Sequence, residues 1–335
     1  MNLVTGATGF LGSHIVERLV MEGSAVRVLV RPTSDTRFLD RLPVEKVVGD
    51  LSNRTGLDRF CEGMDVVYHA AARVSDWGPW AAFQRDTVEA TRNLAHAAHK
   101  TGVRRFVHIS SVGVYAPRRG EGLAIDETSP LGGGDRWSRY RRAKALAEEV
   151  LWALHRDDGL PLTVMRPGWI YGPRDTTILP RFHRVLTAGA VRILGDGQNR
   201  ISAIFVGDMV EACLIAAGND RAVGQAYNCT GEGVITQQTF VDLWADALGC
   251  PRPHRRIPYG VAMSAASVWE WMGRLVGRRT PPLITRYGVR IMGRFVHFPA
   301  DKARLELGWT PKVSYEEGIR LTAQWYLGHL QGGGK

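Results

Sequence analysis

The chain has 335 residues, of which 44% are hydrophobic and 23% charged, a balance typical of a folded protein rather than a disordered one. Its formal net charge of +10 raises the question of an acidic partner. The basic residues are nevertheless spread along the chain and surround no recognisable nucleic-acid module, so we expect no nucleic acid partner.

The first apolar run begins at Leu3 and continues directly into a glycine motif, so we expect no cleaved signal or transit peptide. No uninterrupted apolar run reaches about 18 residues, which predicts no integral membrane segment. The four cysteines are far apart, without the paired spacing of a metal site or a disulfide framework. We therefore expect no metal and a reducing, cytoplasmic location.

Residues 3–23, LVTGATGFLGSHIVERLVMEG, have the pattern of a short buried strand, a glycine turn and a helix. Glycines at positions 6, 9 and 12 permit a tight turn, close approach of the backbone to a pyrophosphate, and close packing of helix on sheet. A glycine turn without a ligand is the alternative. We expect cofactor contacts here from Gly6, Thr8, Gly9, Phe10 and Leu11.

Further buried-type strands follow, separated by helical stretches such as 81–100 and 138–156. The strand segments are AVRVLVRP (25–32), VEKVVGD (44–50), DVVYHAAA (65–72), RFVHISS (105–111) and LTVMRPG (162–168). Repeated strand-helix units predict an α/β fold, a Rossmann-type doubly wound parallel sheet, with ligands at the carboxyl ends of the strands.

Arg31 stands at the end of the second strand, where an acidic residue would favour NAD and an arginine can hold a 2′-phosphate. We therefore expect NADP(H) to be preferred. Asp35, four residues later, keeps NAD(H) open.

Tyr140 and Lys144 lie four residues apart in SRYRRAKALAEE, a segment otherwise typical of a solvated helix. The alternative is that both are ordinary surface residues of such a helix. Both side chains share one helix face, however, and an ammonium beside a phenol would favour its ionised form and lower its pKa. Such a tyrosine could act as a general acid or base near neutral pH.

Taken together, the motifs resemble those of the extended short-chain dehydrogenase/reductase superfamily over nearly the whole chain. The resemblance rests on TGATGFLG, HAAA, HISSVGVY, YRRAK, RPGWIYGPR, GDGQNRISAIFVGDMVEA and LGWTPKVSYEEGI. VSDWGPW and RPGWIYGP look most like the 3β-hydroxysteroid dehydrogenase branch, which includes 2-alkyl-3-oxoalkanoate reductases.

The resemblance implies a catalytic set of Ser111, Tyr140 and Lys144. Tyr140 would exchange a proton with the substrate oxygen, Lys144 would lower the tyrosine pKa and bind the nicotinamide ribose, and Ser111 would hydrogen-bond the same oxygen. Preorganised donors of this kind stabilise the negative charge that hydride transfer builds on a carbonyl oxygen. The implied cofactor contacts further along the chain are Asp50, Leu51, Ala70, Ala71, Ala72, Pro167 and Gly168.

Two departures bear on the reaction. Sugar-nucleotide epimerases commonly have asparagine where this chain has Trp169, and 4,6-dehydratases have an acidic pair where it has Val112 and Gly113. An NAD-dependent sugar-nucleotide epimerase stays an alternative, as does a non-catalytic dinucleotide-binding regulator. The intact Ser111, Tyr140 and Lys144 argue against the regulator.

We expect residues 1–170 to form the dinucleotide-binding domain, with returning segments near 201–229, and residues 171–335 to form mainly a smaller C-terminal α/β substrate-binding lobe. Trp77, Trp80, Trp169 and Tyr171 are candidates for the substrate pocket, with ordinary core packing as the alternative. The resemblance also implies a homodimer.

The apolar stretch within 257–277 could lie against a membrane, although Glu270 interrupts it, so peripheral contact is possible. These features predict an NADP(H)-dependent oxidoreductase that interconverts a secondary alcohol and a ketone on a bulky apolar small molecule. A sterol-like or lipid-derived β-hydroxy or β-keto acid is the expected substrate.

Overall fold

The computed structural model describes residues 1–75, 77–116, 123–132, 138–278, 280–282, 284–293 and 296–331. Its centre is a seven-stranded sheet with the order β12-β7-β5-β4-β1-β2-β3, in which every neighbouring pair is parallel. The strands are β1 (Asn2–Thr5), β2 (Val26–Val30), β3 (Glu45–Val48), β4 (Val66–His69), β5 (Arg105–Ile109), β7 (Leu162–Pro167) and β12 (Gln225–Cys229). The predicted Rossmann-type doubly wound fold is confirmed.

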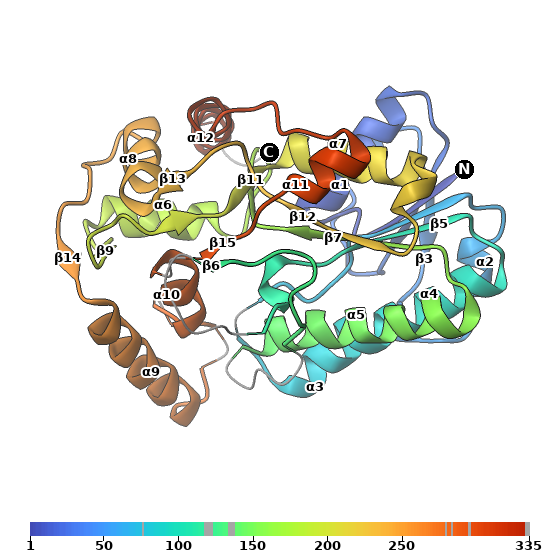
Figure 1. Cartoon of the computed structure of the whole chain (residues 1–335), viewed down its shortest axis with the longest axis horizontal. Helices are drawn as coiled ribbons and strands as arrows, with labels where there is room; N and C mark the ends of the chain where they lie inside the picture. Colours follow the sequence, from blue (N-terminus) through green and yellow to red (C-terminus); the bar gives the residue numbers. More distant parts are fainter. Residues whose placement is uncertain are drawn as a thin grey trace.

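Helices cover both faces of this sheet (Figure 1). On one face α1 (Phe10–Met21) packs against α7 (Val206–Gly218), and α11 (Asp301–Leu307) lies beside them. On the other face are α2 (Asp58–Cys61), α4 (Ala90–Lys100) and α5 (Arg139–Asp158). The apolar side chains of both layers bury the inner strands of the sheet, which are rich in hydrophobic residues, whereas the edge strand β3 is largely exposed.

The long predicted helix over 81–100 is divided in the structure. It consists of α3 (Trp80–Phe83), a π-helical turn (Gln84–Glu89) and α4. The Thr87 hydroxyl lies in the π-helical turn and accepts a hydrogen bond from the Arg73 backbone amide at 3.0 Å. The predicted helix over 138–156 is confirmed as α5, with Ser138 as its N-cap and Gly159 in the left-handed conformation at its end.

The remaining elements lie mainly at the other end of the molecule (Figure 1). They form two-stranded pairs, β8 with β11, β9 with β14, β10 with β13, and β6 with β15. Their bounds are β6 (Leu123–Ala124), β8 (Trp169–Tyr171), α6 (Leu179–Thr187), β9 (Ile193–Leu194), β10 (Arg200–Ile201), β11 (Ala203–Phe205), β13 (Ile235–Thr236), α8 (Gln237–Ala247), β14 (Arg256–Ile257), α9 (Tyr259–Leu275), α10 (Arg286–Gly293), β15 (Val296–His297) and α12 (Tyr315–Gln331). The division into two domains at residue 170 stays a prediction.

Within the described ranges, no helix is both long and apolar enough to cross a bilayer.

A buried ion pair joins α5 to the sheet. The Arg166 guanidinium on β7 donates to both carboxylate oxygens of Glu148 on α5, with the shortest N–O distance 2.6 Å, and both side chains are almost fully buried. Ser110 at the end of β5 also donates to Glu148, while Arg166 donates to the Tyr115 hydroxyl at 3.0 Å. The network therefore connects α5, β7 and the segment after β5.

Replacing Glu148 with alanine should lower the free energy of unfolding by about 3–5 kcal/mol, because it leaves the buried Arg166 cation without its carboxylate. Urea denaturation followed by circular dichroism measures this change. Glu149→Ala, at the exposed neighbouring position, should change stability by no more than about 0.5 kcal/mol. Equal effects of the two substitutions would contradict the role of the buried pair.

Candidate active site

The glycine turn after β1 leaves no space for side chains. Gly6 has φ +70°, and a Cβ there would lie 2.7 Å from the Ala71 amide nitrogen. A Cβ at Gly12 would lie 2.2 Å from the Gly6 carbonyl oxygen. The helix α1 begins after Gly9 with no side-chain cap, so its first backbone N–H groups are not covered by a side chain. This cradle fits a dinucleotide pyrophosphate, with Thr8, Phe10 and Leu11 at the helix start.

The predicted cofactor residues further along the chain follow other strands of the sheet and lie at the same edge as the glycine turn. The alanines 70–72 follow β4, and Ala70 and Ala71 pack directly against Gly6. Pro167 ends β7, and a Cβ at Gly168 would lie 2.4 Å from the Ser202 carbonyl oxygen. Leu51 is buried, and its carbonyl accepts from the Asn93 side-chain amide at 2.9 Å. The topology therefore brings the predicted cofactor residues to the carboxyl ends of the strands.

Arg31 follows β2 directly, as predicted, and its side chain is exposed. The pKa of Asp50 is lowered chiefly by a hydrogen bond from the Ser52 backbone amide, and also by the charge of Arg31. Asp35 forms a bidentate ion pair with Arg37, with N–O distances of 3.0 Å to Oδ1 and 2.7 Å to Oδ2, which lowers the pKa of Asp35 to about 2. The Asp35 carboxylate, which left NAD(H) as an alternative cofactor, is thus already paired with Arg37.

Tyr140 and Lys144 lie on the face of α5 that covers the end of β5. The Lys144 ammonium donates to the Ile109 carbonyl at 2.6 Å and is buried, which lowers the pKa of Lys144 to about 8. Burial raises the pKa of Tyr140 to about 12, while a hydrogen bond with Ser111 acts in the opposite direction. The predicted lowering of the Tyr140 pKa is therefore wrong for this structure, because the loss of water around the phenol raises the pKa more than the hydrogen bond lowers it.

The loop that carries Ser111 is fixed by contacts that the sequence did not indicate. Ser111 Oγ accepts from the Gly113 amide at 3.1 Å. Arg141, next to Tyr140, donates to the carbonyls of Gly113 and Tyr115 at 2.5 and 2.8 Å. These bonds hold the serine loop against the start of α5, so Arg141 positions two catalytic candidates at once.

A second contact to Tyr140 comes from a distant segment. Tyr287 on α10 packs edge-on against Tyr140 with ring centroids 6.0 Å apart. No motif around Tyr287 suggested a role in the sequence, because its placement depends on how α10 packs on the first part of the chain. The structure therefore adds Tyr287 to the candidate site.

The four aromatic pocket candidates have different surroundings. Trp80 is partly buried, beneath the Arg142 guanidinium at 4.2 Å from its ring, and packs in the same cluster as Tyr140. Trp77 is 8% exposed and donates to the Arg278 carbonyl at 2.8 Å, so it joins α9 to the loop after β4. The structure therefore places Trp80 beside the candidate tyrosine, whereas Trp77 has a structural contact, and the assignment of both to a substrate pocket stays a prediction.

Trp169 is partly buried and packs edge-on against Phe182 and Phe240. Tyr171 is 2% exposed and lies inside the aromatic core, stacked on Tyr315. A substrate could reach a partly buried ring but not an enclosed one. We therefore assign Tyr171 to the core, and Trp169 stays a pocket candidate.

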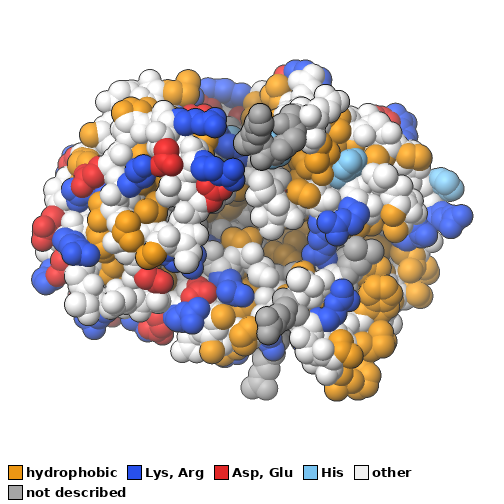
Figure 2. Space-filling model, turned by 180° about the vertical axis from the view of Figure 1, so that it is seen from behind, with side chains coloured by type: hydrophobic (Ala, Val, Ile, Leu, Met, Phe, Trp, Pro, Cys, Tyr) orange, Lys and Arg blue, Asp and Glu red, His pale blue; other side chains and the backbone are white. Residues whose placement is uncertain are grey.

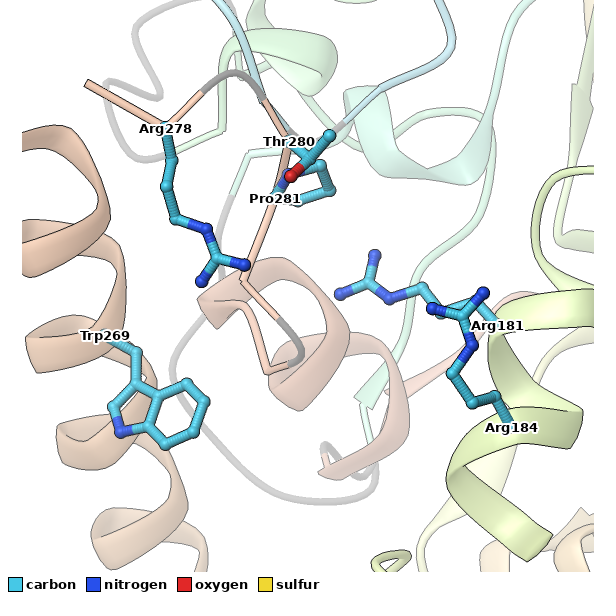
Figure 3. A pocket seen from close by; sticks show the side chains of 6 residues that line it. All are labelled: Arg181, Arg184, Trp269, Arg278, Thr280 and Pro281. Atoms are coloured by element: carbon cyan, nitrogen blue, oxygen red, sulfur yellow. The ribbon is translucent and has the colours of Figure 1, made fainter. Parts of the chain in front are cut away.

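A separate pocket of about 390 Å³ lies between α6 and the segment after α9 (Figure 3). Arginine side chains project into it from two elements, with the indole of Trp269 on α9 at one side. Its lining residues are Arg181, Arg184, Trp269, Arg278, Thr280 and Pro281. None of them belongs to the predicted catalytic or cofactor sets.

Comparisons with known proteins identify the family of the chain. Residues 2–230 match the NAD dependent epimerase/dehydratase family. A ketoreductase of a farnesylated dihydroquinoline oxide from Stigmatella aurantiaca is 31% identical over 96% of this chain and 95% of its own length. A 2-alkyl-3-oxoalkanoate reductase from Stenotrophomonas maltophilia is 29% identical over 95% of this chain and 97% of its own.

A 3β-hydroxysteroid-dehydrogenase/decarboxylase from Arabidopsis thaliana is 29% identical over 96% of this chain and 78% of its own. The solved dTDP-glucose 4,6-dehydratase of Streptomyces venezuelae with bound NAD superposes with a TM-score of 0.78 and 25% identity, covering 99% of this chain and 98% of that one. The predicted enzyme class is confirmed. The chain belongs to the NAD dependent epimerase/dehydratase family, as an extended short-chain oxidoreductase of the 3β-hydroxysteroid dehydrogenase and 2-alkyl-3-oxoalkanoate reductase branch.

Proposed function

We propose that this protein is an NADP(H)-dependent oxidoreductase that interconverts a ketone and a secondary alcohol on a bulky apolar substrate. The observation that carries the proposal is the Tyr140 hydroxyl, which is hydrogen-bonded to Ser111 and lies one helical turn from the buried Lys144. Like any tyrosine whose pKa is not lowered, Tyr140 is protonated throughout the neutral range. It is therefore a proton donor for an oxygen that becomes negative as a carbonyl is reduced.

Each catalytic candidate has a separate task in this reaction. Tyr140 gives its proton to the substrate oxygen, and Ser111 donates a hydrogen bond to the same oxygen. Lys144 holds a positive charge one helical turn from Tyr140, which favours negative charge at the site. A bound nicotinamide cofactor supplies the hydride, and Gly6, Gly9 and the start of α1 would hold its pyrophosphate.

The relatives favour an apolar substrate. Their names describe ketones or alcohols on farnesylated, alkyl and steroid skeletons. Two aromatic rings lie near the candidate tyrosine, since Trp80 packs in its cluster and Tyr287 contacts it edge-on. We therefore propose a sterol-like or lipid-derived β-keto or β-hydroxy acid, whose oxidised form could lose carbon dioxide.

NADP(H) is the cofactor we propose. Arg31 occupies the position after β2 that faces the adenosine ribose in this fold, and its guanidinium suits a 2′-phosphate. Asp35 is paired with Arg37, so it competes weakly for a free ribose hydroxyl. We also propose a cytoplasmic homodimer with α5 at its interface.

A sugar-nucleotide epimerase is the second candidate, favoured by the match of residues 2–230 to the NAD dependent epimerase/dehydratase family. Trp169 argues against it, because this indole packs on Phe182 and Phe240 where epimerases commonly have an asparagine.

Tyr140→Phe should lower kcat for ketone reduction roughly a hundredfold to ten-thousandfold, because the proton donor is lost. NADPH binding, followed by the fluorescence of the cofactor, should stay unchanged. Tyr326→Phe, a substitution in α12 far along the chain, serves as the matched control and should keep full turnover. A Tyr140→Phe enzyme with undiminished turnover would exclude the proposed proton donor.

Arg31→Ala should weaken NADPH binding roughly tenfold to a hundredfold, because one charge-assisted contact to the 2′-phosphate is removed. Affinity for NADH should be nearly unchanged. Arg54→Ala, another exposed arginine, should leave both affinities as they are. Equal weakening of both cofactors, or of neither, would contradict the role of Arg31.

A further inference from the structure

The helix α9 (Tyr259–Leu275) exposes large apolar side chains to solvent and buries small or charged ones, the reverse of what a helix on a water-facing surface usually does. Its buried positions are small or charged, namely Ala262, Ala266, Glu270 and Gly273. Met263 packs partly against the core, whereas six other bulky apolar side chains of the helix are exposed, as is Val276 just after it. The six are Val261, Val268, Trp269, Trp271, Met272 and Leu275.

These exposed residues recur at helical spacing and form one stripe. Positions 261, 268, 272 and 275 follow the intervals of seven, four and three residues that place side chains on one helix face. Trp271 is 62% exposed and Leu275 66% exposed. Figure 2 shows hydrophobic side chains gathered at the lower right of that view, where α9 lies after the turn from Figure 1.

The charges around this stripe have one sign. The only acidic residue of α9, Glu270, is buried and paired with Arg286 at 2.7 Å and with Arg274 at 3.3 Å, so these two arginines together outnumber its single negative charge. Arg255 and Arg256 precede the helix, and Arg274 and Arg278 stand at its end, all with exposed side chains. A cationic rim around an apolar stripe matches an anionic lipid surface, where apolar side chains enter the acyl boundary and arginines meet acidic headgroups.

The arginine pocket is continuous with this stripe. Trp269 on α9 and Arg278 just after it both line the pocket, together with Arg184 on α6 (Figure 3). Neither Arg184 nor Arg278 has a carboxylate partner in the part of the chain that the structure describes. A lipid phosphate bound there would lie beside the apolar stripe.

We propose that the exposed face of α9, with the adjoining arginine pocket, docks the protein onto an anionic lipid bilayer. A second copy of this chain is a poorer occupant, because two such faces would bring their arginine rims together. The docked face leads toward the candidate site, since α9 packs on α10 and Tyr287 of α10 touches Tyr140. The docking itself does not depend on the proposed reaction.

Co-sedimentation of the full chain with vesicles tests the proposal. The protein should pellet with vesicles of phosphatidylcholine and phosphatidylglycerol and remain largely in solution with phosphatidylcholine alone. Binding should weaken as salt is raised, because the headgroup attraction is screened. Equal binding to both vesicle types, or to neither, would overturn the proposal.

A double variant, Trp271→Glu with Leu275→Glu, should lower the partition onto anionic vesicles by at least about tenfold, since it replaces two exposed apolar side chains that docking would bury. Both positions are exposed, so the fold should be kept. The matched control, Met21→Glu with Leu305→Glu, places the same charges at exposed apolar positions on α1 and α11 and should bind like the unmodified chain.

Sedimentation equilibrium of the same proteins tests the alternative that a second copy of this chain covers the α9 face. If the α9 double variant changes the oligomeric state while vesicle binding is absent or unchanged, the face is a contact between copies and the membrane proposal fails. Arg184→Gln with Arg278→Gln should weaken binding to anionic vesicles at low salt. Unaltered binding in that variant would remove the pocket from the proposed surface.

Discussion

The ion pair between Glu148 and Arg166 fixes how α5 lies on the sheet, and the candidate site depends on that placement. Tyr140, Lys144 and Glu148 are spaced by four residues and therefore share one helix face. Glu148 binds Arg166 of β7 and Ser110 at the end of β5, so the same face is held over the carboxyl ends of these strands. Lys144 then reaches the Ile109 carbonyl and Tyr140 reaches Ser111.

This network also joins the site to the later part of the chain. The Tyr115 hydroxyl accepts from Arg166 and donates to Asn228 on β12 at 2.6 Å. The Asn228 backbone amide in turn donates to Glu127 at 2.7 Å. A buried charge needs such partners, and here they surround the loop of Ser111. The position of the candidate Ser111 hydroxyl thus depends on the packing of several segments that are far apart in the sequence.

Much of the fold could be predicted from the sequence because its signals are local. Alternating strand and helix patterns indicate a parallel sheet, and the glycine turn at Gly6 needs a backbone that only glycine adopts readily. The spacing of Tyr140 and Lys144 gave their common helix face. Each of these inferences depends on residues close together in the chain.

The rest depends on contacts between distant segments. Tyr287 meets Tyr140, and Trp77 meets the Arg278 carbonyl, across long separations in sequence that no local pattern encodes. Tyr171 and Trp169 looked alike in the sequence, yet one is enclosed by the aromatic core and the other is partly accessible. The raised pKa of Tyr140 likewise follows from burial, which a helix pattern does not specify.

The transfer of deuterium from labelled NADPH to a 2-alkyl-3-keto acid or a 3-ketosteroid tests the central claim most directly. The account predicts that mass spectrometry finds one deuterium on the carbon of the new secondary alcohol. If neither ketone acquires the label, and a UDP-sugar is instead epimerised with no net oxidation of added cofactor, the assignment as a ketone reductase is contradicted.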